Sequence, residues 1–196
     1  MTNEEFYGSY YNMIRVIDTA VEAMIYNSIH DAEDTDKKLV KYISHRIKSA
    51  ESAIAKLTRH GLECTADNAM QHLTDIVGYR VVVRFLSDMY VIQDRIEKTE
   101  FMHIINVKDY VSHPKPNGYR AIHLIVHVEI SGQCMPIEIQ LRTMAMDCWA
   151  SLEHQVCYKQ NVQNREEIVA LMKECADKML EVDKSMDNTK ARMQLV

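Results

Sequence analysis

Glycine and proline are scarce in this chain, whose 196 residues include five glycines and three prolines. Six of these eight residues lie between Gly78 and Pro136. Both residue types interrupt helices and favour turns. Long helices are therefore expected towards the two ends of the chain, and strands with tight turns in the middle.

Other absences exclude whole classes of protein. No apolar run approaches the roughly 18 residues that a membrane-spanning helix needs, and the opening residues MTNEEF lack the apolar segment of a signal peptide. The five cysteines show no CxxC spacing, which argues against a zinc site or a disulfide framework. These features predict a cytoplasmic protein that does not enter membranes.

An excess of positive charge is also missing. The formal net charge is −5 at pH 7, whereas extensive nucleic-acid binding usually requires a basic surface. A small anionic ligand held by a few local cations is compatible with this charge. Length and composition, with 47% apolar and 26% charged residues, are typical of one globular domain.

The spacing of apolar residues predicts the order of the elements. Helices are expected at 4–29, 36–60, 87–98, 143–158 and from 165 to the end, and strands at 75–85, 101–110, 120–130 and 134–143. We predict an α+β (mixed α/β) fold with a central mixed sheet of four to five strands flanked by N-terminal and C-terminal helices. The single domain, 1–196, would comprise an N-terminal helix (1–35), a catalytic core (36–159) and a C-terminal helix (160–196).

The last two predicted strands carry polar residues at alternate positions. Because alternate side chains of a strand share a face, Glu138, Gln140 and Arg142 are expected on the face opposite the apolar residues between them. A two-residue turn at Ser131 and Gly132 would place His123 opposite Gln140. Alternation alone is typical of a solvated strand face, so the preceding loop decides the interpretation.

That loop, KDYVSHPKPNGYR, combines cations with an aromatic ring. Lys108, Lys115 and Arg120 suit phosphate groups. Tyr119, supported by the Asn117-Gly118 turn, could stack on a base. The loop therefore favours a nucleotide as the ligand of this face.

A second cationic group lies within the predicted helix 36–60. There, Lys48 and Lys56 are expected near one face, with Arg46 beside them. Helices often carry such lysines only for solubility, but Asp75 is a carboxylate at the edge of an apolar strand and needs a partner. Together with Glu138 it provides two carboxylates among many cations, a composition that fits Mg²⁺-assisted phosphoryl or pyrophosphoryl transfer between nucleotides.

Five segments occur in order between residues 42 and 159: RIKSAESAIAKL, DIVGYRVVVRFLSDMY, VKDYVSHPKPNGYRAIHLIV, IEIQLRT and WASLEHQVCYK. Together they resemble the synthetase domain of the RelA/SpoT family in its single-domain, small alarmone synthetase form. The resemblance implies a nucleotidyltransferase-like fold and a stringent-response enzyme that moves pyrophosphate from ATP to the 3′-hydroxyl of GDP or GTP. The products would be AMP and (p)ppGpp.

The resemblance also implies roles for individual residues on the ATP side. Arg46 and Arg80 would flank the adenine, and Lys48 and Lys56 would hold the ATP phosphates. Asp75 would bind Mg²⁺.

On the acceptor side, Tyr119 would stack on the guanine. Glu138 would assist metal binding or activate the 3′-hydroxyl. The remaining residues implied around the acceptor nucleotide are Lys108, Lys115, Asn117, His123, Gln140 and Arg142.

Some questions stay open at this point. The acceptor could instead be an adenine nucleotide or a tRNA end, or the domain could bind nucleotide or RNA without turnover. The presence of Asp75 and Glu138 favours an enzyme, and the acidic net charge disfavours extensive RNA contact. Ala121 stands where this family usually has a serine, and Glu153 and His154 could contact either the ligand or the protein itself.

Two further patterns have simpler interpretations. HDAEDT at 30–35 echoes a metal motif of phosphohydrolases, but such a site needs further ligands on separate helices, so an acidic loop is expected. The last helix carries a heptad seam formed by Ile168, Met172, Cys175, Met179, Val182 and Met186. The seam could pack on the body of the protein or form a homo-oligomer such as a dimer or tetramer.

Overall fold

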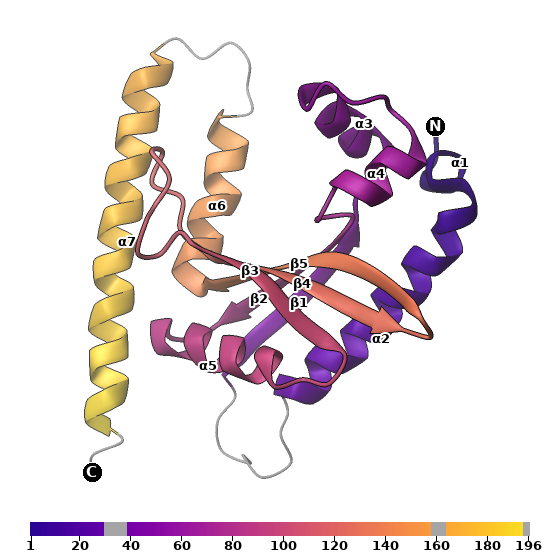
Figure 1. Ribbon diagram of the computed structural model, residues 1–196. Helices are drawn as coiled ribbons and strands as arrows, with labels where there is room; N and C mark the ends of the chain where they lie inside the picture. Colours follow the sequence, from indigo (N-terminus) through magenta and orange to yellow (C-terminus); the bar gives the residue numbers. More distant parts are fainter. Residues whose placement is uncertain (30–38, 158–163, 194–196) are drawn as a thin grey trace.

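A computed structural model describes residues 1–29, 39–157 and 164–193 (Figure 1). Its elements are α1 (Asn3–Tyr7), the 3-10 helix η1 (Gly8–Tyr10), α2 (Tyr11–Ile29), β1 (Val40–Ile47), α3 (Ala50–Arg59), α4 (Ala66–His72), β2 (Val77–Val83), α5 (Leu86–Glu97), β3 (Met102–Asp109), β4 (Ile122–Ile130), β5 (Gln133–Thr143), α6 (Met144–Cys157) and α7 (Arg165–Met193). In the described part of the chain, no helix is long and apolar enough to cross a membrane.

The five strands form one mixed sheet in the order β1-β2-β5-β4-β3. The β2–β5 pair is parallel and the other three pairs are antiparallel. The turn between β4 and β5 has two residues with positive φ, Ser131 at 52° and Gly132 at 74°, as a tight hairpin requires. The predicted mixed sheet of four to five strands is confirmed, as is the position of His123 opposite Gln140.

The two faces of the sheet differ in character. One face packs on α2 and α5, which lie together on one side of the sheet (Figure 1). Alternate residues of β5 enter this core, and Met135, Ile137, Ile139 and Leu141 are at most 1% exposed. At the other face, α3 and α4 stand at one end and α6 and α7 at the other (Figure 1). The polar residues of the sheet between those helices are exposed or partly buried, except for His123 and Arg142, which are buried.

The predicted helix at 36–60 is wrong in its first half. Residues from Val40 to Ile47 form strand β1, which pairs antiparallel with β2, and the helix α3 starts only at Ala50. Long-range pairing with a buried strand outweighs the local preference of this segment, as is common for strands. The sequence does contain a local signal for a helix that begins at Ala50. Ser49 caps α3 by accepting a hydrogen bond from the amide of Ser52.

Two smaller differences between the predicted and the observed helices occur in the N-terminal half of the chain. The predicted helix 4–29 is interrupted at Gly8, whose φ of 51° breaks the helical geometry. Helix α4, capped by the Thr65 side chain, was not expected. The HDAEDT segment, residues 30–35, lies outside the described residues.

Helix α7 lies beside α6 (Figure 1), and several polar groups anchor it to the rest of the protein. The buried Asp183 accepts a hydrogen bond from the Thr143 hydroxyl at 2.6 Å, and Asp187 accepts from both the amide and the hydroxyl of Ser87. The predicted heptad seam is divided between two environments. Met172 and Met179 are half-buried, whereas Cys175, Val182 and Met186 are exposed.

Candidate active site

The polar face of the sheet carries one continuous cross-strand row. In register across all five strands, the row is Ser44, Arg80, Gln140, His123 and Lys108. Glu138 on β5 lies two residues from Gln140 and therefore on the same face. Residues separated by up to about sixty positions in the sequence thus become neighbours through strand pairing.

A pocket of about 220 Å³ opens on this face. Its lining comes from β1, β2, β5 and the turn before β2, and consists of Ser44, His45, Arg46, Asp75, Gly78, Tyr79, Arg80, Glu138 and Gln140. Both carboxylates expected from the sequence, Asp75 and Glu138, thus border the same space. Arg46 and Arg80 border it from adjacent strands.

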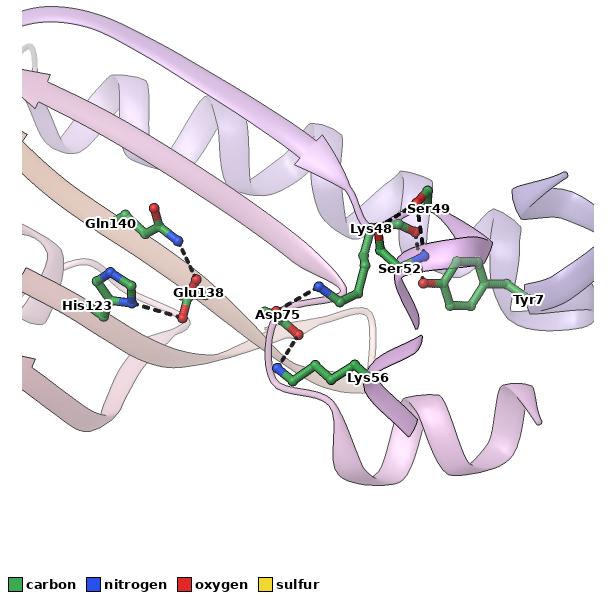
Figure 2. A network of polar contacts seen from close by, with 9 residues as sticks. All are labelled: Tyr7, Lys48, Ser49, Ser52, Lys56, Asp75, His123, Glu138 and Gln140. Atoms are coloured by element: carbon green, nitrogen blue, oxygen red, sulfur yellow. Dashed lines mark hydrogen bonds and ion pairs between the residues drawn. The ribbon is translucent and has the colours of Figure 1, made fainter. Parts of the chain in front are cut away.

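Asp75 is held by two lysines, as Figure 2 shows. The Nζ atoms of Lys48 and Lys56 each lie 2.9 Å from a carboxylate oxygen of Asp75. Burial opposes ionisation of Asp75, but the hydrogen bonds and charges of these lysines outweigh it and lower its pKa. The result is a compact group with two positive charges and one negative charge.

The two lysines do not share a helix, contrary to the sequence-based expectation. Lys56 belongs to α3, whereas Lys48 lies between β1 and α3, and Arg46 is on β1. The backbone around Lys48 is fixed by long-range contacts, because the Tyr7 hydroxyl donates to its carbonyl at 2.9 Å and its amide donates to Ile76 at 2.7 Å. The two ammonium groups converge through tertiary structure rather than through helical spacing.

Glu138 sits within a hydrogen-bonded group (Figure 2). Its carboxylate lies 3.1 Å from Nδ1 of His123 and accepts from the amide nitrogen of Gln140 at 2.6 Å. Burial alone would raise the pKa of Glu138, but contacts with His123 and Gln140 and the nearby charge of Lys56 lower it to about 2. Glu138 is therefore a fixed negative charge at neutral pH.

Tyr119 adjoins this group from the loop before β4. Its hydroxyl lies 2.7 Å from Nε2 of His123 and accepts a hydrogen bond from Arg142 at 2.9 Å. The ammonium of Lys115 lies 4.8 Å from the centroid of the Tyr119 ring, and the guanidinium carbon of Arg142 lies 5.3 Å from it. Two cations therefore lie close to the ring on which a base is expected to stack.

The rest of the loop is anchored to the protein. Asn117 accepts from the amide of Tyr119 and donates to Glu153 at 3.3 Å, so Glu153 has a structural contact here. Gly118 has a φ of 92°, and a Cβ at this position would lie 2.9 Å from that of Ala176 on α7. Only glycine permits this close approach.

Two of the loop cations occupy different surroundings from those expected. Arg120, expected to face phosphates, instead forms an ion pair with Asp177 of α7 at 2.7 Å, and its side chain is 10% exposed. Lys108 is exposed on β3, next to His123 in the cross-strand row. Arg120 is therefore turned towards α7, whereas the role of the loop in nucleotide binding stays a prediction.

The residues can accommodate Mg²⁺ only together with other ligands. Among the residues that the structure describes, no group of three or more His, Cys, Asp or Glu side chains could hold a metal ion. Mg²⁺ in nucleotide sites is usually bound by one or two carboxylates, with phosphates and waters completing the shell. Asp75 and Glu138 on one pocket fit that arrangement.

One polar residue of this region was missed by sequence reasoning. Asp147, in the first turn of α6, is 8% exposed and contacts Arg80 and Arg142. The available signal was an acidic residue four positions after Thr143, at the start of a helix that follows a strand with arginine. Nothing local indicated which arginines it would meet.

A pocket that pairs several cations with two carboxylates on an open mixed sheet is typical of proteins that bind nucleotide phosphates. Comparison with known proteins agrees. The model of the region found in RelA / SpoT proteins matches residues 45–163. The GTP pyrophosphokinase YwaC of Bacillus subtilis (strain 168) is 38% identical over 173 residues, which cover 83% of this chain and 80% of that protein.

Solved structures show the same relationship. The small alarmone synthetase 2 from Bacillus subtilis matches with a TM-score of 0.81 and 34% identity, covering 93% of this chain and 98% of that chain. The small alarmone synthetase 1 from Bacillus subtilis, bound to its product pppGpp, shares the fold with a TM-score of 0.79 at 23% identity, covering 97% of each chain. The chain belongs to the RelA/SpoT family, as the five sequence segments had indicated.

Proposed function

We propose that this protein transfers the pyrophosphate group of ATP to the 3′-hydroxyl of GDP or GTP, giving AMP and (p)ppGpp. The observation that carries the proposal is the pocket that Glu138 borders together with Asp75, whose carboxylate is held by Lys48 and Lys56. Family membership and the activities named for the relatives support it. We also infer a cytoplasmic location, because the five cysteines show no spacing typical of a disulfide framework.

On the donor side, Arg46 and Arg80 would flank the adenine, and Lys48 and Lys56 would neutralise the phosphates of ATP. Cations preorganised around a transferring phosphoryl group stabilise the charge of the transition state. Both lysines already point at one position, Asp75, so they are ordered before ATP arrives. When ATP binds, its phosphates would replace the Asp75 carboxylate as the partner of the two lysines.

On the acceptor side, the nucleotide base would stack on Tyr119, and its phosphates would attract Lys115 away from the ring. The acceptor 3′-oxygen attacks the β-phosphorus of ATP, the bond from that phosphorus to the α-phosphate oxygen breaks, and AMP leaves, while the hydroxyl proton is released to water. Glu138 would accept a hydrogen bond from the 3′-hydroxyl. Because its pKa is about 2, Glu138 is a weak base. Its proposed role is therefore to orient the hydroxyl rather than to remove its proton before the transition state.

Mg²⁺, when bound, would neutralise charge on the ATP phosphates, with Asp75 and Glu138 as its protein ligands. Gln140, His123 and Arg142 would form the side of the pocket that binds the acceptor nucleotide. Asn117 would support the turn that carries Tyr119, and Lys108, on the edge strand β3, would lie beside the acceptor-binding residues.

The proposed activity has a direct test. The protein is incubated with Mg²⁺, ATP labelled in the γ-phosphate, and GDP, GTP, an adenine nucleotide or tRNA in turn. Label that moves to GDP or GTP with release of AMP supports the proposal. Label transferred only to an adenine nucleotide or tRNA would identify another acceptor, and nucleotide binding without transfer would indicate a non-catalytic module.

Mg²⁺ should bind weakly to the free protein and much more tightly once an ATP analogue is present. In the free protein two lysines already satisfy Asp75, and the phosphates would draw them away. Calorimetric titration with Mg²⁺, with and without a non-hydrolysable ATP analogue, measures this difference after correction for Mg²⁺ binding by the free analogue. Asp75→Asn should abolish the gain, whereas Asp94→Asn, an exposed surface change, should not. Equal Mg²⁺ affinity in both conditions would contradict the proposed ligand.

We further propose that the protein forms a closed homo-oligomer, a dimer or tetramer, through the exposed part of the α7 seam. Val182 and Met186 are 52% and 56% exposed, and they continue the heptad repeat of the seam beyond the half-buried Met172 and Met179. Burying such residues against a second helix removes apolar area from water. Symmetric closed assemblies are the usual result of such self-association.

Glutamate at both Val182 and Met186 should shift the protein towards monomer in sedimentation while leaving its helical content largely intact. The charge would enter the proposed interface without disturbing the half-buried Met172 and Met179. Asn188→Glu, on a different side of α7, serves as the matched control. Native protein that already sediments as a monomer at micromolar concentration would refute the assembly.

A further inference from the structure

Asp147 is a buried carboxylate at the junction of β5 and α6. The Thr143 hydroxyl caps α6 by accepting a hydrogen bond from the Met146 amide at 3.1 Å. This places Asp147 in the first turn of the helix, where the helix dipole favours a negative charge. Its side chain is 11% exposed. A carboxylate so buried requires compensating partners.

Three groups from three different strands provide that compensation. Nη1 of Arg142 on β5 donates to Oδ1 of Asp147 at 3.1 Å. Nη1 of Arg80 on β2 lies 3.3 Å from the same oxygen. The hydroxyl of Tyr42 on β1 donates to Oδ2. The carboxylate therefore fixes two guanidinium groups at once.

The two arginines serve different halves of the proposed site. Arg80 borders the pocket next to Arg46, where the adenine of ATP is expected. Arg142 uses its other terminal nitrogen to donate to the Tyr119 hydroxyl and to Gln140, each at 2.9 Å. Asp147 thus lies between the donor half and the acceptor half of the site.

We propose that Asp147 is a positioning residue that orders both nucleotide subsites by holding Arg80 and Arg142. This inference rests on the proposed function, because it assigns the two arginines to ATP and to the acceptor. An arginine side chain without an anchor has many rotamers, and ordering it during binding weakens affinity. A buried carboxylate that holds both guanidinium groups removes that loss before either nucleotide binds.

Asp147→Asn keeps the shape of the side chain and removes its charge. We expect the Kd of a non-hydrolysable ATP analogue and the Kd of GDP both to rise about tenfold, the size expected for a lost charge-assisted contact to each arginine. The decisive measurement repeats the substitution in two backgrounds. In Arg80→Gln protein, Asp147→Asn should no longer affect the ATP analogue but should still weaken GDP. In Arg142→Gln protein the pattern should reverse.

Asp88→Asn is the matched control, because Asp88 is 1% exposed and pairs with Lys190 away from the pocket. It should lower thermal stability without changing either Kd. Tyr42→Phe, at a residue that is 44% exposed, removes one anchor of Asp147 and should weaken both nucleotides by about twofold to threefold. This variant tests the idea even if Asp147→Asn does not fold.

The outcomes separate the two proposals. Wild type that converts ATP and GDP, combined with unchanged affinities in Asp147→Asn and Tyr42→Phe, would refute the role of Asp147 alone. Losses that persist for both nucleotides in both arginine backgrounds would show a general structural effect and refute it as well. Wild type that binds neither nucleotide would refute the proposed function and this inference together.

Discussion

Glu138→Gln should lower kcat at least about a hundredfold while the protein remains folded, as expected when a group that acts on the reacting hydroxyl or its metal is lost. Glutamine has nearly the same shape and can still accept the hydrogen bond from Gln140, but it carries no charge. Steady-state transfer of label from ATP to GDP measures the loss. Thermal unfolding of the variant checks that the fold is retained.

The matched control for this prediction is Glu129→Gln, at an exposed position on the neighbouring strand β4. It should leave kcat nearly unchanged. Turnover of Glu138→Gln close to that of wild type would remove Glu138 from the mechanism.

The pH dependence gives an independent check on Glu138. Its pKa is lowered from 4.5 to about 2 in the folded protein, so its ionised form stabilises the fold above pH 4.5. That contribution is lost as the pH falls from 4.5 towards 2. Between pH 5 and 8 Glu138 does not titrate, so any change of kcat in that range must come from another group.

Tyr119→Ala should weaken GDP or GTP far more than ATP. Stacking of a base on an aromatic side chain contributes about 1–3 kcal/mol, which corresponds to roughly a 5-fold to 150-fold rise in the acceptor Kd. The Kd of an ATP analogue should change little, because the residues proposed to bind ATP lie on β1, β2, α3 and the turn between β1 and α3. Calorimetric titration of each nucleotide separates the two effects.

Tyr119→Phe distinguishes the ring from the hydroxyl. The ring remains, so acceptor affinity should be nearly retained. The hydroxyl contacts with His123 and Arg142 disappear, so the hydrogen-bonded group around Glu138 loosens and kcat should fall by about twofold to tenfold. Tyr26→Ala, at an exposed residue of α2, is the control for loss of a tyrosine. Equal losses for ATP and acceptor in Tyr119→Ala would refute the stacking role.

Much of the site could be predicted from local sequence. The alternation of β5 placed Glu138, Gln140 and Arg142 on one face, and the two-residue turn set His123 opposite Gln140, as the structure confirms. Both conclusions depend only on the period of two in a strand and on the length of a hairpin turn. The loop that carries Lys115 and Tyr119 was equally visible, because its proline, asparagine and glycine specify a turn.

Tertiary structure decided what those local rules could not. Whether residues 40–47 form a helix or a strand depended on pairing with β2, far along the chain, and the strand then separated Arg46 and Lys48 from the helix of Lys56. The parallel pairing of β2 with β5 brought Asp75 and Glu138 to one pocket. The contacts of Asp147 and the ion pair of Arg120 with Asp177 arose in the same way. Local rules act over a few residues, whereas these contacts follow from strand register and helix docking, whose free energy comes from burial shared by the whole fold.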